Sequence, residues 1–116
     1  MELKPEKVND VTVIPVPVEF LDTSNTREFK DKITPILATV KNLVLDLRAV
    51  NFIDSTGVGA LLTVLKQLST FGGDLKLCCV AKPVRALFEL IRMHRIVEIF
   101  PTREEAIAAF AKKEGH

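Results

Sequence analysis

The sequence lacks any apolar run close to the roughly 20 residues that a membrane span requires, and its N-terminus does not have the pattern of a signal peptide. We therefore expect a cytoplasmic protein without membrane association. The sequence also lacks an excess of charge of either sign, because its 16 Lys and Arg residues are nearly balanced by 15 Asp and Glu residues. A net charge of +1 provides no electrostatic reason to expect nucleic acid or an anionic membrane as a partner.

Residues suited to metal binding or redox chemistry are scarce. The two cysteines, Cys78 and Cys79, are adjacent, no Cys-x-x-Cys motif is present, and His94 and His116 do not have the spacing of a ligand pair. If the cysteines lie in a strand, their side chains point to opposite faces, and a disulfide between them is strained. We therefore expect two small, partly buried thiols, no metal site and no cofactor.

The length and composition suit one domain over residues 1–116, since 116 residues with 47% hydrophobic content are enough for a single core. Apolar periodicity predicts the order β-β-α-β-α-β-α-β-α. The expected strands cover residues 3–8, 11–18, 43–47, 75–80 and 96–100, and the expected helices lie around residues 25–40, 57–71, 83–91 and 102–113. Strands that alternate with helices pair in parallel, so we expect an α/β fold: one mixed, mostly parallel sheet with an opening hairpin and packed helices.

Local signals mark the ends of the first and last helices. Asn25 with Glu28, and Thr102 with Glu105, have the spacing of a capping box, in which each side chain bonds the other residue's N–H. Pro35 lies inside the first helical pattern. An interior proline loses a hydrogen bond and clashes with the preceding turn, so we expect that helix to be kinked or broken just before Pro35.

The most informative stretch is an Asp-Ser-Thr-Gly turn at residues 54–57, which follows a short apolar run and precedes a helical pattern. These features predict a buried strand, a turn and the N-terminus of a helix, where N–H groups are unpaired and the helix dipole is positive. The simplest interpretation is structural. Ser55 or Thr56 caps the helix, while Gly57 and Gly59 permit close packing against the strand.

Enzymatic interpretations of this turn fail on spacing. A hydrolase elbow reads Gly-x-Ser-x-Gly, but Ile53 occupies the first glycine position, and the sequence places no histidine beside Ser55. The aspartic-protease triplet Asp-Thr-Gly fails because the glycine follows Asp54 by three positions. A dinucleotide fingerprint needs a third glycine where Leu62 stands, and there is no P-loop. We expect no catalytic residue and no enzymatic activity.

Residues 44–47 (Val-Leu-Asp-Leu) and 50–59 (Val-Asn-Phe-Ile-Asp-Ser-Thr-Gly-Val-Gly) resemble the signature of STAS domains, and more narrowly that of bacterial anti-sigma factor antagonists. The resemblance covers nearly the whole chain. It implies partner switching in transcription control: the unphosphorylated antagonist binds a GHKL-type serine kinase that is also an anti-sigma factor, which releases a sigma factor. The kinase then phosphorylates the turn serine with ATP, and a metal-dependent (PP2C-type) phosphatase resets the antagonist.

Carried across by position, the resemblance implies that Ser55 is the phosphorylated residue. It places Asp22, Asp54, Ser55, Thr56 and Gly57 at the partner-binding surface. A phosphate adds about −1.5 to −2 charges, and a helix N-terminus can accept it, so we expect the fold to survive and the switch to act on binding. We expect the free protein to be a monomer.

One position departs from the family pattern. Glu19 stands where the family usually has glycine, so a side chain enters a turn that is normally bare, next to the expected interface. Together with the strand prolines Pro15 and Pro17, this departure motivates an alternative function. The alternative is a STAS scaffold or transporter-complex subunit without a phosphorylation switch.

Overall fold

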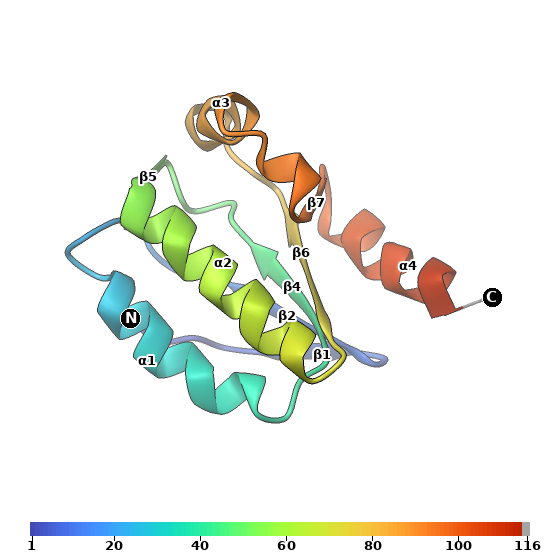
Figure 1. Cartoon of the computed structure of the whole chain (residues 1–116). Helices are drawn as coiled ribbons and strands as arrows, with labels where there is room; N and C mark the ends of the chain where they lie inside the picture. The colour runs from blue at the N-terminus through green and yellow to red at the C-terminus, as the bar shows by residue number, and fades with distance from the viewer. Residues whose placement is uncertain (115–116) are drawn as a thin grey trace.

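The computed structural model describes the backbone of residues 1–114 and the side chains of residues 1–111 (Figure 1). The strands are β1 (Glu6–Val8), β2 (Val11–Pro15), β3 (Phe20–Leu21), β4 (Asn42–Asp46), β5 (Phe52–Ile53), β6 (Asp74–Cys78) and β7 (Glu98–Phe100). The helices are α1 (Thr26–Leu37), α2 (Ser55–Thr70), α3 (Lys82–Leu90), the 3₁₀ turn η1 (Met93–Arg95) and α4 (Arg103–Glu114). The expected alternation of strands and helices is confirmed, with β3 and β5 as two short strands that the sequence did not reveal.

The main sheet has five strands in the order β1-β2-β4-β6-β7. Strands β1 and β2 pair antiparallel, and all other neighbours pair in parallel, which confirms the mixed, mostly parallel sheet. Strand β2 ends at Pro15, three residues earlier than expected. The N–H of Val16 still donates to Asp46 O at 3.0 Å, but Pro17 has no N–H to continue the ladder.

Helices cover both faces of this sheet. Figure 1 shows α1 and α2 side by side across one face, where their apolar residues, with those of α3, form the larger core. Ile14 and Leu45, paired across β2 and β4, belong to that core. The neighbouring pair Val13 and Val44 points to the other face and packs with α4. This alternation with a period of two places consecutive residues of each strand under different helices.

Pro35 does not break α1. The helix continues through Pro35 to Leu37, so the expected break is wrong. The proline lies in the last turn of the helix, so few intrahelical hydrogen bonds remain beyond it to be disrupted.

The two expected capping boxes have different outcomes. At α4, the N–H of Glu105 donates to Thr102 Oγ1 at 3.1 Å, which confirms Thr102 as a capping side chain. At α1, the Asn25 side chain makes no capping bond, and Glu28 instead pairs with the N-terminal amine. The α1 prediction is wrong because Asn25 is committed to the preceding loop, where its Nδ2 donates to Phe20 O at 2.7 Å.

Gly57 and Gly59 differ in the space around them. A Cβ on Gly57 would lie 2.4 Å from Leu21 O and 2.5 Å from Ile53 Cγ1, so this glycine permits close contact between α2 and the short strands. A Cβ on Gly59 would meet no atom within 4 Å. The expectation of close packing is therefore confirmed for Gly57 and wrong for Gly59.

This difference predicts opposite effects of the same substitution. Gly57→Ala should lower the free energy of unfolding by about 1–3 kcal/mol, because the methyl group overpacks against backbone. Gly59→Ala should raise it by about 0.5–1 kcal/mol, because alanine favours a helix interior. Urea denaturation of the two variants checks both. Equal changes in stability would contradict the contact at Gly57.

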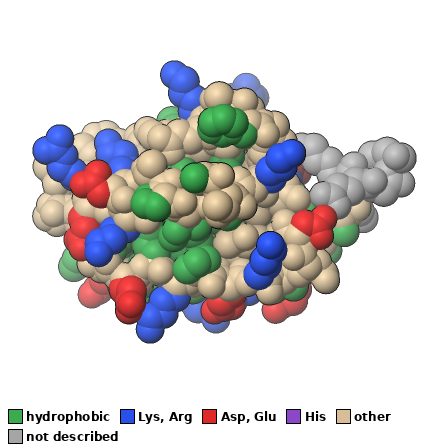
Figure 2. Space-filling model, turned by 90° about the horizontal axis from the view of Figure 1, so that it is seen from below, with side chains coloured by type: hydrophobic (Ala, Val, Ile, Leu, Met, Phe, Trp, Pro, Cys, Tyr) green, Lys and Arg blue, Asp and Glu red, His purple; other side chains and the backbone are tan. Residues whose placement is uncertain are grey.

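One face of the molecule carries a hydrophobic surface. Figure 2 shows hydrophobic side chains gathered in the middle of this face, with Lys, Arg, Asp and Glu side chains around its edge. A groove of about 510 Å³ is lined by Leu37, Val40 and Phe71, at the C-terminal ends of α1 and α2. No helix within the described part of the chain has the length and apolar character needed to cross a membrane.

Candidate functional site

Two short strands position the turn that the sequence singles out. Strands β3 and β5 pair in parallel, with Phe20 beside Phe52 and Leu21 beside Ile53. The carbonyl oxygen of Glu19 extends the contact by accepting from Asn51 N at 2.8 Å. This small sheet brings the loop before α1 next to the N-terminus of α2, although the two are some thirty residues apart in the chain.

Asp54 is the N-cap of α2, so the structural interpretation in which Ser55 or Thr56 caps the helix is wrong. One carboxylate oxygen, Oδ1, accepts from the N–H of Gly57 at 3.0 Å and from Thr56 Oγ1 at 2.6 Å. The other, Oδ2, accepts from Thr23 N at 3.2 Å and Thr23 Oγ1 at 3.1 Å. A single carboxylate therefore caps the helix and ties it to the loop before α1.

These bonds hold the pKa of Asp54 at about 2, below its ordinary 3.8, chiefly through the Thr56 hydroxyl and then the Gly57 N–H. Because the folded state lowers the pKa, the carboxylate favours folding above pH 3.8, and this contribution is lost as the pH falls toward 2. We predict an Asp54 carboxyl titration midpoint near 2 by NMR, and a shallower acid-induced loss of stability in Asp54→Asn. A midpoint at or above 3.8 would contradict the cap geometry.

Ser55 is the first residue of α2 and is exposed. Within the part of the chain that the structure describes, its hydroxyl has no hydrogen-bond partner, whereas the neighbouring Thr56 hydroxyl is engaged by Asp54. The first N–H groups of the helix lack intrahelical acceptors, so Ser55 lies at the positive end of a 16-residue helix. Its hydroxyl is therefore free to react with, or bind to, another molecule.

Asp22 belongs to the same surface. Its Oδ1 accepts from the N–H of Ser24 at 3.0 Å, and its carbonyl oxygen accepts from Asn25 N and Thr26 N at 3.0 Å each. Thr23, the next residue, is the one that bonds to Asp54. The structure thus brings together the five residues that the resemblance places at the interface: Asp22, Asp54, Ser55, Thr56 and Gly57. Of these, Gly57 is buried beneath the turn and contributes through its backbone and its lack of a side chain.

Sequence reasoning missed two aromatic residues at this surface. Phe20 and Phe52 are 51% and 48% exposed, and their rings meet edge to face with centroids 6.2 Å apart. Both lie in two-residue strands, too short for any apolar periodicity to reveal. Half-exposed aromatic side chains that pair with each other are typical of a protein-binding surface.

Glu19 fits this surface without backbone strain. It is exposed, and it is not among the described residues with positive φ, so the turn does not require the glycine that is usual in the family. Its side chain adds a third acidic group to those of Asp22 and Asp54. Phe20 and Phe52 therefore each lie within two residues of an acidic side chain along the chain.

The site has the features of a binding surface. What the arrangement can do is accept a phosphoryl group at an exposed hydroxyl and present an apolar patch with acidic neighbours to another protein.

Comparisons with known proteins agree with the fold. The family model of the STAS domain matches residues 2–106. BtrV of Bordetella bronchiseptica, assigned as an anti-sigma factor antagonist, is 39% identical over 70 residues, or 60% of each chain. A Thermotoga maritima protein with the same assignment is 30% identical over 111 residues, which covers 94% of this chain and 98% of that protein.

Solved structures show the same architecture. The crystal structure of a Thermotoga maritima protein assigned as an anti-sigma factor antagonist has a TM-score of 0.84 at 28% identity, and the match covers 92% of each chain. The Bacillus protein SpoIIAA in its phosphorylated form has a TM-score of 0.69 at 23% identity, covering 93% of this chain and 98% of that chain, a likeness of fold. The two curated relatives above are assigned as anti-sigma factor antagonists, and the chain belongs to the STAS domain family.

Proposed function

We propose that this protein is an anti-sigma factor antagonist of the bacterial cytoplasm, switched by phosphorylation at Ser55. Unphosphorylated, it binds a GHKL-type serine kinase that also acts as an anti-sigma factor, and the sigma factor is released. The kinase transfers the γ-phosphoryl group of ATP to Ser55 Oγ, and the phosphorylated antagonist dissociates. A metal-dependent (PP2C-type) phosphatase returns it to the binding form. The chain itself is a regulatory binding protein without enzymatic activity.

One observation carries this proposal: the Ser55 hydroxyl is exposed at the positive end of α2 and has no hydrogen-bond partner among the described residues. A kinase active site must surround the hydroxyl that it phosphorylates, which is easiest for a group that is accessible and makes no competing hydrogen bond within the fold. The names of the relatives support the same function, since proteins assigned as anti-sigma factor antagonists align along nearly the whole chain.

The proposed switch acts through charge at a fixed surface. A phosphate near neutral pH carries about −1.5 to −2 charges, which the helix dipole and the first N–H groups of α2 can stabilise in the free protein. In the complex, the same group would be buried against a partner already facing Asp22 and Asp54. An unpaired charge at an interface is costly, so phosphorylation favours dissociation without a change of fold.

The test is a phosphorylation reaction with ATP and the GHKL-type kinases of the host organism, followed by mass spectrometry of the intact chain and its peptides. We expect one phosphate, located at Ser55, and none on Ser55→Ala. Ser69→Ala, at an exposed serine in the last turn of α2, serves as a matched control that retains the acceptor. If no host kinase modifies the chain, and protein purified from its own cells is unmodified, the scaffold or transporter-complex function replaces this proposal.

A further inference from the structure

The backbone at Cys79 places two thiols together. Cys78 ends β6 and faces α4, and an extended Cys79 would point to the opposite face of the sheet, as expected from the sequence. Instead Cys79 has a φ of 60°, in the left-handed region, and packs with the same apolar cluster as Cys78. The expected strand over residues 75–80 therefore ends two residues early, and the expectation of opposite faces, which holds only within a strand, does not apply to Cys79.

A buried carboxylate completes this cluster. Asp46 is the register partner of Cys78 across β4 and β6, so its side chain shares the same face of the sheet. The Cys78 Sγ, the Cys79 Sγ and one carboxylate oxygen of Asp46 lie within 4.8 Å of one another. The thiols are free, and Cys79 is only half-buried, which leaves a path from solvent.

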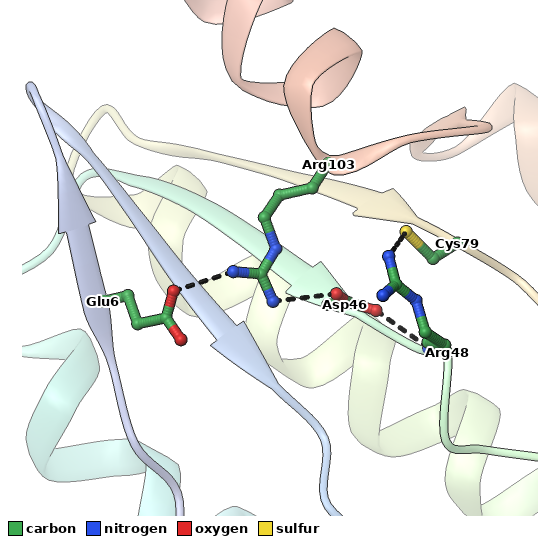
Figure 3. Close-up of polar contacts among 5 residues, drawn as sticks. All are labelled: Glu6, Asp46, Arg48, Cys79 and Arg103. Atoms are coloured by element: carbon green, nitrogen blue, oxygen red, sulfur yellow. Dashed lines mark hydrogen bonds and ion pairs between the residues drawn. The ribbon is translucent and has the colours of Figure 1, made fainter.

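Two arginines form hydrogen bonds with Asp46 and Cys79 (Figure 3). Arg48 donates its backbone N–H to Asp46 Oδ1 at 2.9 Å and its Nη2–H to Cys79 Sγ at 3.4 Å. Arg103 donates to Asp46 Oδ2 at 2.9 Å and to Glu6 Oε2 at 2.7 Å. The two guanidinium charges are balanced by the two carboxylates, so the cluster is neutral while both thiols are protonated.

A disulfide between Cys78 and Cys79 would be strained. Consecutive Cα atoms are about 3.8 Å apart, whereas disulfides usually join Cα atoms about 4.4–6.8 Å apart. A bridging metal ion avoids this strain because the two sulfurs need not bond to each other. Two sulfurs that each lie about 2.3 Å from a tetrahedral Zn²⁺ are separated by nearly 4 Å. The observed grouping needs only a small inward movement to reach that geometry.

We propose that Cys78, Cys79 and Asp46 form a three-ligand site for a thiophilic divalent cation of the Zn²⁺ class, with the fourth position open to water. Binding releases the two thiol protons to solvent, and the cation's two charges replace them, so the cluster remains neutral. The arginines act as outer partners: Arg48 donates to a thiolate sulfur, and Arg103 orients the carboxylate. Because binding releases two thiol protons, the affinity for the cation should increase with pH.

The test uses the full-length, reduced, tag-free chain and Cd²⁺, whose bonds to thiolates absorb in the ultraviolet whereas its bonds to histidine do not. We expect saturation at one Cd²⁺ per chain, release of two protons, and reversal by excess Zn²⁺. Cys79→Gly should abolish this absorption while folding at least as stably as the original, since glycine suits a φ of 60°. Arg48→Ala should weaken Cd²⁺ binding by about 10- to 100-fold, the usual effect of losing an outer partner.

Two results would overturn the site: no thiolate absorption in the original chain, or the same absorption and proton release in Cys79→Gly. Cys78→Ala provides a second variant, and undiminished binding by it would also exclude the paired-thiol geometry. Ser55→Ala is the matched control for the phosphorylation site and should bind Cd²⁺ like the original chain. The test of the metal site is therefore independent of the test of the proposed function.

Discussion

Ser55→Asp is expected to weaken binding to the cognate kinase by a factor of roughly 30 to several thousand, while the circular dichroism spectrum stays native. An unpaired charge buried at an interface costs about 2–5 kcal/mol, and each 1.4 kcal/mol changes the dissociation constant about tenfold. The free protein should tolerate the change, because a carboxylate at the first position of α2 interacts favourably with the helix dipole. Calorimetric titration of kinase with the variant and the original chain provides the measurement.

Ser69→Asp is the matched control for this experiment. Ser69 is an exposed serine in the last turn of the same helix, remote from the turn at residues 54–57. The added charge is identical, and its cost is limited to a few tenths of a kcal/mol in helix stability, since an acidic group at a helix C-terminus opposes the dipole. Equal affinities of Ser55→Asp and the original chain for the kinase would refute the switch. Equal losses in both variants would show that net charge alone, and not position, determines binding.

Replacement of the exposed aromatic pair should have the second largest effect. Phe20→Ala and Phe52→Ala are each expected to cost about 2 kcal/mol of binding free energy, or roughly 30-fold in the dissociation constant, as for an aromatic anchor at the centre of an interface. The cost to the fold should be smaller, about 0.5–1.5 kcal/mol, because each ring is half-exposed and loses mainly its edge-to-face partner. Binding assays on the two variants, with thermal denaturation beside them, separate the two effects.

Phe71 is the control for the aromatic pair. It is 72% exposed at the C-terminal end of α2, the end opposite Ser55. Phe71→Ala removes as much apolar surface as the other two substitutions, so an effect of hydrophobicity alone would appear in all three variants. We expect kinase affinity to be unchanged in Phe71→Ala. Loss of binding in this variant, with binding retained in Phe20→Ala, would place the docking surface at the other end of the molecule.

Much of the fold follows from apolar patterns. The runs that predicted strands at residues 43–47 and 75–80 are β4 and β6, each displaced by one or two residues. Helix α2 ends at Thr70, and Gly72 takes the left-handed conformation, with a φ of 78°, that glycine accepts after a helix. These predictions succeed because burial on a sheet or helix face imposes a period that is visible without knowledge of the tertiary structure.

Features set by contacts between distant residues could not be predicted in this way. Strands β3 and β5 have two residues each, and they exist because the backbones of residues 19–21 and 51–54 meet in space. The capping role of Asp54 depends on the same contact, since Thr23 supplies half of its hydrogen bonds. The residues of the turn alone therefore predict the position of the helix N-terminus correctly, but they favour Ser55 or Thr56 as the cap.

The burial of a charged side chain is a second feature that could not be predicted from the sequence. Lys76 alternates with apolar residues in β6, and its side chain is only 1% exposed. Its ammonium group pairs with Glu98 and lies 4.6 Å from the centre of the Phe110 ring in α4. The sequence contains the lysine, but its burial is determined by strand β7 and helix α4, which lie more than twenty residues further along the chain. Such a residue can be assigned to the interior only when its partners are known.

The exposed phenylalanine pair has a spectroscopic consequence. The chain contains no tryptophan and no tyrosine, so phenylalanine is its only aromatic side chain with ultraviolet fluorescence. Any tryptophan emission from a complex must therefore originate in the partner. If a partner tryptophan packs against Phe20 and Phe52, its emission will shift to shorter wavelength on binding and return when Ser55 is phosphorylated, so association and release can both be followed without a label.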